Sequence, residues 1–341
     1  MSAERPIYLR AHGGPDHQGV PLVDFSTNSN ACGPCPAALL AVRQADASQY
    51  PDPAYTALRQ QLAKFHDVTV QRVLLAASAS EFIFRITALV ARQAGRTICL
   101  PPHSYGDYAQ AARAYGLAVV TGAETAALRW ACEPSSPLGA AQPGLGELVD
   151  GIEANAVVVL DRAYEPLRLS GALALTDAQL HTVWQLWTPN KALGLTGVRA
   201  AYVIAPLEAE EAVEALEQLC PSWPVGAHGV AMLQAWTRSN VQTWLADSRH
   251  TLRDWKARQI ALCESMGWTC VPSHANFFCV RPLLSAAMTL QQALAALRSQ
   301  GIKLRDTASF GLPGYVRVSV QAPAGQDALA QACQHVIRKT P

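Results

Sequence analysis

Positions 187–199 read Trp187-Thr188-Pro189-Asn190-Lys191-Ala192-Leu193-Gly194-Leu195-Thr196-Gly197-Val198-Arg199. A single lysine stands among small and neutral residues, followed by two glycines and, eight positions on, by an arginine. A lysine with no acid nearby suits an amine that must form a Schiff base better than it suits a solvated surface. Glycines let the backbone approach a bulky group, and an arginine can clamp a phosphate. We therefore take Lys191 and Arg199 as candidate site residues.

An acidic residue ends the apolar segment that precedes this stretch. Residues 157–160 read Val-Val-Val-Leu, and Asp161 follows directly, with Tyr164 three positions on. A continuously apolar run is typical of a strand covered on both faces, and its carboxyl end is where open α/β folds bind ligands. A carboxylate at that point can pair with a protonated pyridine nitrogen.

Two earlier segments also follow predicted strands. Ala77-Ser78-Ala79-Ser80-Glu81 lies between the apolar run 73–77 and a helical pattern, where hydroxyl side chains and free N–H groups can bind a phosphate. Tyr105 follows the predicted strand 97–100 and can stack on a ring. Each signal is weak alone, because caps, turns and core packing use the same residues. Their joint order along the chain is much harder to obtain by chance.

The hydrophobic pattern predicts a layered α/β fold. Predicted strands alternate with helical segments in the middle of the chain, which favours a mainly parallel sheet with helices on both faces. The last third instead predicts two helices followed by a strand, a helix and a strand. The predicted strands of the middle region are 73–77, 97–100, 117–121, 157–160 and 200–204. The later helices are 208–219, 229–256 and 288–298, with strands at 277–280 and 315–320.

The composition excludes several classes of protein. The 341 residues are 50% hydrophobic, which excludes a disordered chain. The net charge of +1 disfavours a general nucleic-acid or membrane binder, although a few arginines can still bind an anion. Residues 1–10 lack the pattern of a signal peptide, no apolar run is long enough to cross a bilayer, and the nine cysteines are mostly scattered. We therefore expect a cytoplasmic protein.

One short motif points to a different chemistry. Cys32-Gly33-Pro34-Cys35 spells the thioredoxin redox motif, but the rest of the chain does not favour that fold. No second cysteine or histidine pair has ligand spacing, so no metal site is expected. No Gly-x-Gly-x-x-Gly opens a helix either, which disfavours a dinucleotide site.

Taken together, the ordered motifs resemble the class I/II aminotransferase superfamily of pyridoxal 5'-phosphate (PLP) enzymes over nearly the whole chain. The resemblance implies the PLP-dependent transferase fold, with a large domain at 41–207 built on a mixed, mainly parallel seven-stranded sheet. It also implies a small α+β domain formed by residues 1–40 and 208–341. A homodimer with shared active sites is expected from the same resemblance.

The resemblance also assigns roles to single residues. It implies that Lys191 is the Schiff-base lysine, that Asp161 pairs with the pyridinium and that Tyr164 bonds the phenolic oxygen of the cofactor. Tyr105 would stack on the ring and Arg199 would bind the phosphate. The other implied cofactor residues are the phosphate turn Ser78, Ala79 and Ser80, together with Ser136, Thr188, Asn190 and, in the neighbouring subunit's site, Tyr50. Arg317 would hold a substrate carboxylate.

Two branches of the superfamily fit, and both act on small amino phosphates. The segment Ala11-His12-Gly13-Gly14 and the stretch 24–30 are more similar to threonine-O-3-phosphate decarboxylase of cobalamin biosynthesis. The alternative is an aminotransferase of the histidinol-phosphate type, and a non-catalytic PLP-binding relative is a third reading. The decarboxylase reading places a further set of residues around the substrate: His12, Gly13, Asn28, Arg305 and Arg317.

Some positions depart from the family pattern. Ser136 stands where an asparagine is usual, Asn190 where a serine usually precedes the lysine, and Arg162 where a glutamate is usual. A serine is shorter than an asparagine, so its contact to the phenolic oxygen differs. These departures leave the choice between decarboxylation and transamination open.

Overall fold

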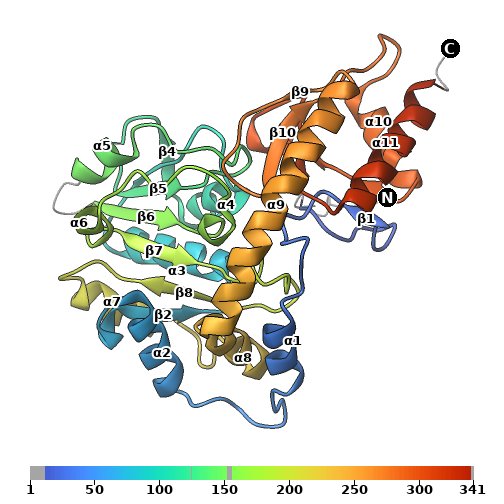
Figure 1. Cartoon of the computed structure of the whole chain (residues 1–341). Helices are drawn as coiled ribbons and strands as arrows, with labels where there is room; N and C mark the ends of the chain where they lie inside the picture. Colours follow the sequence, from blue (N-terminus) through green and yellow to red (C-terminus); the bar gives the residue numbers. More distant parts are fainter. Residues whose placement is uncertain (1–11, 124, 152–155, 339–341) are drawn as a thin grey trace, which may run out of the picture.

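A seven-stranded mixed sheet forms the larger part of the protein in the computed structural model, which describes residues 12–123, 125–151 and 156–338 (Figure 1). Residues 1–11, assigned above to the start of the small domain, lie outside this range. In spatial order the strands are β2 (Val73–Ala76), β8 (Ala201–Ile204), β7 (Trp184–Trp187), β6 (Val157–Asp161), β5 (Leu128–Cys132), β3 (Thr97–Cys99) and β4 (Ala118–Val120). Only β8 runs antiparallel to its neighbours. The predicted fold class is therefore confirmed.

Two strands of this sheet are missing from the prediction. Strand β5 contains Arg129, which is fully buried and whose Nη1 donates a hydrogen bond to the Gly151 carbonyl oxygen at 2.7 Å. Strand β7 contains Gln185, whose amide donates to the Leu180 carbonyl oxygen at 2.9 Å. A polar side chain interrupts the apolar run in each strand, so neither segment has the continuous apolar pattern of the strands that were predicted.

Helices cover both faces of the sheet. Side chains alternate along each strand, so Leu74 and Ala76 of β2 face one layer while Val73 and Leu75 face the other. The first layer contains α3 (Ala79–Arg92), α4 (Gly106–Tyr115) and α7 (Glu210–Gln218). The second contains α1 (Pro36–Arg43), α2 (Thr56–His66), α5 (Leu145–Asp150), α6 (Asp177–Leu180), α8 (Ala227–Trp236) and part of α9 (Ser239–Ser265).

The long helix α9 connects this sheet to a smaller α+β unit (Figure 1). There, β1 (Val23–Asp24) pairs in parallel with β11 (Ile302–Lys303), so the N-terminal segment lies beside the last third of the chain. A second sheet has the order β12 (Arg305–Asp306), β13 (Val316–Ser319), β10 (Phe277–Arg281) and β9 (Thr269–Cys270). The unit is completed by α10 (Leu290–Ser299) and α11 (Pro323–Arg338). In the described part of the chain, none of the helices has the length and apolar character needed to cross a membrane.

Residues 30–35 support the turn that contains Lys191. The Asn30 amide donates to the Lys191 carbonyl oxygen at 2.9 Å, and the Cys35 amide donates to that of Leu193 at 2.8 Å. Burial raises the pKa of the Cys32 thiol, and Cys35 is fully buried at the start of α1. The Cys-Gly-Pro-Cys motif therefore packs against the turn that contains Lys191.

The close packing of residues 30–35 against the turn that contains Lys191 requires a glycine at position 194. A substitution at this position tests that requirement. The φ of Gly194 is +68°, and an added Cβ would lie 2.9 Å from the Cα of Pro34. We expect Gly194→Ala to lower the free energy of unfolding by roughly 2–4 kcal/mol, measured by urea titration. The matched control is Gly197→Ala in the same loop, because no atom lies within 4 Å of its added Cβ. Equal unfolding midpoints for the two variants would contradict this account.

Candidate active site

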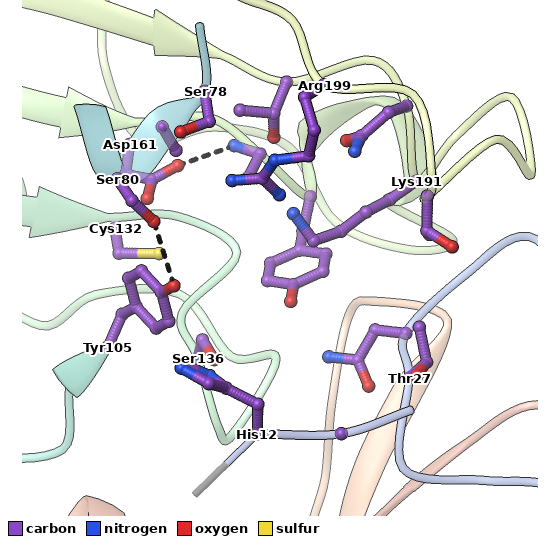
Figure 2. A pocket seen from close by; sticks show the side chains of 18 of the residues that line it. His12, Thr27, Ser78, Ser80, Tyr105, Cys132, Ser136, Asp161, Lys191 and Arg199 are labelled. Atoms are coloured by element: carbon purple, nitrogen blue, oxygen red, sulfur yellow. Dashed lines mark hydrogen bonds between the residues drawn. The ribbon is translucent and has the colours of Figure 1, made fainter. Parts of the chain in front are cut away.

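The predicted site residues meet at the carboxyl edge of the sheet, around a cavity of about 280 Å³. Lys191 and Arg199 point into it from one side, and Ser78, Ser80 and Asp161 from the other (Figure 2). The predicted residues that line this cavity are His12, Gly13, Asn28, Ser78, Ala79, Ser80, Tyr105, Ser136, Asp161, Tyr164, Thr188, Asn190, Lys191, Arg199 and Arg317. Residues distant in sequence are thus brought together because parallel strands end at one edge.

Asp161 ends β6 and is the only acid among the described residues that line the cavity. Its Oδ2 accepts a hydrogen bond from the Tyr108 hydroxyl at 2.7 Å, and its Oδ1 accepts one from the Ala163 amide at 2.9 Å. Burial raises the pKa of this carboxyl, while the two hydrogen bonds act in the opposite direction. The carboxylate is therefore rigidly held and able to accept one more donor.

The same cavity also contains groups that suit an anion. Ser78 caps the 14-residue helix α3, and its Oγ accepts a hydrogen bond from the Glu81 amide at 3.1 Å. The Ser80 hydroxyl lies 3.2 Å from that of Tyr105, whose pKa burial raises to about 12. The helix N-terminus carries partial positive charge, and the Arg199 guanidinium lines the same space. These groups can bind a phosphate.

Lys191 lies across the cavity from Asp161, Ser78 and Ser80 (Figure 2). Its Nζ is 5.4 Å from the centre of the Tyr164 ring, which in turn packs edge-on against Phe277 with centroids 4.7 Å apart. Tyr164 is itself buried, so the ring limits where the lysine side chain can move. An amine held above a ring in this way is well placed to react with an aldehyde carbon at the centre of the cavity.

Several buried polar atoms of the cavity wall have no hydrogen-bond partner among the described residues. They are both amide atoms of Asn28, the hydroxyl of Thr188, the amide oxygen of Asn190 and the Nε of Arg317. Leaving buried polar groups unpaired is unfavourable, so such a cluster indicates a polar ligand. This observation supports the predicted membership of Asn28, Thr188 and Asn190 in the site.

A second cavity of about 590 Å³ adjoins the first. The two share His12, Gly13, Tyr105, Ser136, Tyr164 and Arg317, and the second adds Arg113 and Arg305. Arg317 donates to the Ser26 carbonyl oxygen at 3.0 Å and to the Ser136 hydroxyl at 3.3 Å, while its Nε has no partner within the described part of the chain. Burial and the nearby Arg317 lower the pKa of Arg305 to about 10, so Arg305 is still charged at neutral pH.

One predicted residue lies elsewhere, and several lining residues were not predicted. Tyr50 is 78% exposed, lines neither cavity of its own chain and stacks on Trp223. Its predicted contact with a neighbouring subunit stays a prediction. The unpredicted lining residues include Ser26, Thr27, Tyr108, Cys132 and Thr196 in the first cavity and Asp107, Gln110, Arg113, Ser309 and Phe310 in the second. Of these residues, Tyr108 had the clearest signal in the sequence, because it lies one helical turn after the predicted site residue Tyr105.

A fold of this kind, with a lysine, a buried acid and an anion site at the sheet edge, defines a class of enzymes that bind a phosphorylated aldehyde cofactor. The chain belongs to the family described as aminotransferase class I and II, whose model matches residues 20–336. This membership confirms the predicted family, the enzyme class and the cofactor, PLP.

Similar proteins narrow the comparison. The chain is 27% identical over 329 residues to a histidinol-phosphate aminotransferase of Symbiobacterium thermophilum. The match covers 89% of this chain and 87% of the relative. It is 29% identical over 327 residues to that of Halorubrum lacusprofundi, covering 89% and 86%.

Solved structures share the fold. The histidinol-phosphate aminotransferase of Sinorhizobium meliloti, solved with pyridoxal-5'-phosphate, superposes with a TM-score of 0.78 at 23% identity and covers 92% of this chain and 90% of that one. The L-threonine-O-3-phosphate decarboxylase of Porphyromonas gingivalis superposes with a TM-score of 0.70 at 21% identity, covering 88% and 93%. Both predicted branches are therefore represented among proteins of similar structure.

Proposed function

We propose that this protein is a PLP-dependent aminotransferase of the histidinol-phosphate type, which moves an amino group between a small amino phosphate and a 2-oxo acid. The observation that carries this proposal is the pair of adjoining cavities, one around Lys191 and the other around Arg305 and Arg317. The curated relatives support the transaminase reading over the decarboxylase reading.

The residues present fit PLP. Lys191 would hold it covalently, Asp161 would accept a hydrogen bond from its ring nitrogen, and Ser78, Ser80 and Arg199 would bind its phosphate. Tyr105 would stack on the ring, and Tyr164 and Ser136 would face its phenolic oxygen. When bound, the cofactor supplies an electron sink for a bond broken at the substrate α-carbon.

The chain itself must then orient the substrate and move a proton. Arg317 and Arg305 would bind its anionic groups, because guanidinium forks match phosphates and carboxylates. The Lys191 amine, once released, is the one lysine amine among the described residues of the first cavity, and it would carry the proton at the α-carbon.

A second candidate is threonine-O-3-phosphate decarboxylation. The observation that favours it is the wall formed by His12 and Gly13, which lines both cavities. An added Cβ on Gly13 would lie 2.2 Å from the Ser26 carbonyl oxygen, so the backbone passes there as only glycine allows. The structural similarity to a decarboxylase supports this candidate as well.

Substrate trials separate the two reactions. We expect histidinol phosphate with 2-oxoglutarate to yield glutamate in a coupled assay. Threonine phosphate is expected to release little carbon dioxide. Carbon dioxide from threonine phosphate without glutamate from histidinol phosphate would replace the first proposal by the second. Cofactor binding with neither reaction would favour the non-catalytic relative.

Removal of the lysine amine tests its role. Lys191→Ala is expected to abolish turnover, and the absorption band of covalently held cofactor near visible wavelengths should vanish, because no other described cavity residue offers an amine. Borohydride treatment followed by mass spectrometry measures the attachment directly. A cofactor still fixed to the chain in this variant would show that another residue holds it.

Replacement of Arg305 tests the second cavity. Arg305→Ala is expected to raise KM for the phosphorylated substrate roughly 30-fold, about 2 kcal/mol, since a charge-assisted hydrogen bond is lost. KM is measured by steady-state kinetics, and Arg305→Lys should raise it less than Arg305→Ala does. The control is Arg92→Ala, at the exposed end of α3. An unchanged KM in Arg305→Ala would place the phosphate elsewhere.

A further inference from the structure

Tyr108 is a buried tyrosine whose hydroxyl reaches the acid of the site. It lies in the first turn of α4, and its side chain is fully shielded from solvent. Its ring stacks on that of Trp130, with centroids 4.2 Å apart and planes at 13°, and meets Tyr105 edge-on at 5.9 Å. These contacts fix the phenol in one orientation, so its hydroxyl is a stationary donor.

The hydrogen bond from Tyr108 completes the support of Asp161. Each carboxylate oxygen already accepts one donor, the Tyr108 hydroxyl on Oδ2 and the Ala163 amide on Oδ1. Because the two donors hold different oxygens, the carboxylate plane cannot rotate without losing one of them. Other groups near this carboxyl are the Cys132 thiol on β5, a neighbouring strand, and the Lys191 amine across the cavity. Each carboxylate oxygen retains a lone pair for a ligand.

We propose that Tyr108 is a positioning residue for PLP, acting through Asp161: its hydroxyl orients the carboxylate toward the ring nitrogen and favours the ionised form. The inference rests on the proposed placement of the cofactor ring beside Asp161. A donor to a carboxylate stabilises its charged form, and this effect is strong where water is excluded. Without Tyr108, burial would favour the neutral acid, which is a poorer partner for a protonated nitrogen.

A purely structural role of the Tyr108 hydroxyl would have different consequences. Buried tyrosines need a partner for the hydroxyl, so the contact could serve the tyrosine alone. In that case its removal would raise the pKa of the Asp161 carboxyl, because a donor is lost, but would leave the affinity for the cofactor unchanged. Phenylalanine keeps the stacking on Trp130 and removes only the hydroxyl, so Tyr108→Phe separates the two roles.

The test measures Asp161 and cofactor binding directly. In cofactor-free protein with ¹³C-labelled aspartate, Tyr108→Phe should raise the pKa of the Asp161 carboxyl, which Asp161→Asn identifies in the spectrum. In the same variant the Kd for PLP, followed by absorbance titration, should rise about tenfold. An unchanged Kd for PLP in a folded variant would overturn the proposal, whether or not the pKa of Asp161 rises.

Two control experiments test whether the effect is specific to Tyr108 and depends on Asp161. Tyr115→Phe, at the exposed end of the same helix, should change neither value. In an Asp161→Asn background, Tyr108→Phe should no longer affect the Kd for PLP, since its effect passes through the carboxylate. An equal increase of the Kd for PLP in both backgrounds would show that Tyr108 does not act through Asp161. Thermal melting shows whether each variant is folded.

These readouts do not require turnover. A wild-type protein that binds PLP but converts neither amino phosphate would defeat the proposed function while leaving this inference intact. A protein that transaminates but in which Tyr108→Phe changes nothing would defeat the inference alone.

Discussion

The parallel register of β5, β6 and β7 determines where the groups of the site lie. Asp161 pairs with Cys132 on one side and with Leu186 on the other. A slip of one residue would turn every side chain of β6 to the opposite face and remove the carboxylate from the cavity. The backbone continues the register beyond the strands, since the Glu133 amide donates to the Asp161 carbonyl oxygen at 3.2 Å. The catalytic chemistry therefore depends on sheet pairing.

A second set of contacts connects the small unit to this edge. Lys256 on α9 is buried, and its ammonium donates to the carbonyl oxygens of Ser273 and Ala275. The adjoining His274 amide donates to Gly139, in the loop that carries Ser136. The same loop is anchored by Glu133, which forms a buried ion pair with Arg168 at 3.1 Å. The wall shared by the two cavities is thus held from both units, which suits a site that must orient a substrate closely.

The sequence predicts most of the fold and the centre of the site because both depend on local patterns. The sequence itself shows the apolar run before Asp161 and the small residues around Lys191. Neither pattern is typical of a solvated surface. Strands β5 and β7 escape prediction because Arg129 and Gln185 interrupt their apolar runs, and these side chains are paired with Gly151 and Arg162, which are distant in sequence. Tyr108 and Arg113 escape for a related reason. Their helix presents them to the cavities only after the sheet has been assembled, and an aromatic or basic residue in a helix is usually core or surface.

The number of arginines does not distinguish the two candidate reactions. Threonine phosphate carries a carboxylate and a phosphate, whereas histidinol phosphate carries a phosphate only. A transaminase must also accept a dicarboxylate, so both reactions require two anionic groups to be bound at some stage. The two reactions differ in which bond at the α-carbon is broken. In this chain His12, Thr27 and Asn28 line the cavity from the N-terminal segment, and both side-chain amide atoms of Asn28 have no partner among the described residues. The N-terminal segment thus brings polar groups to the cavity that a substrate can pair with, and its position depends on the pairing of β1 with β11.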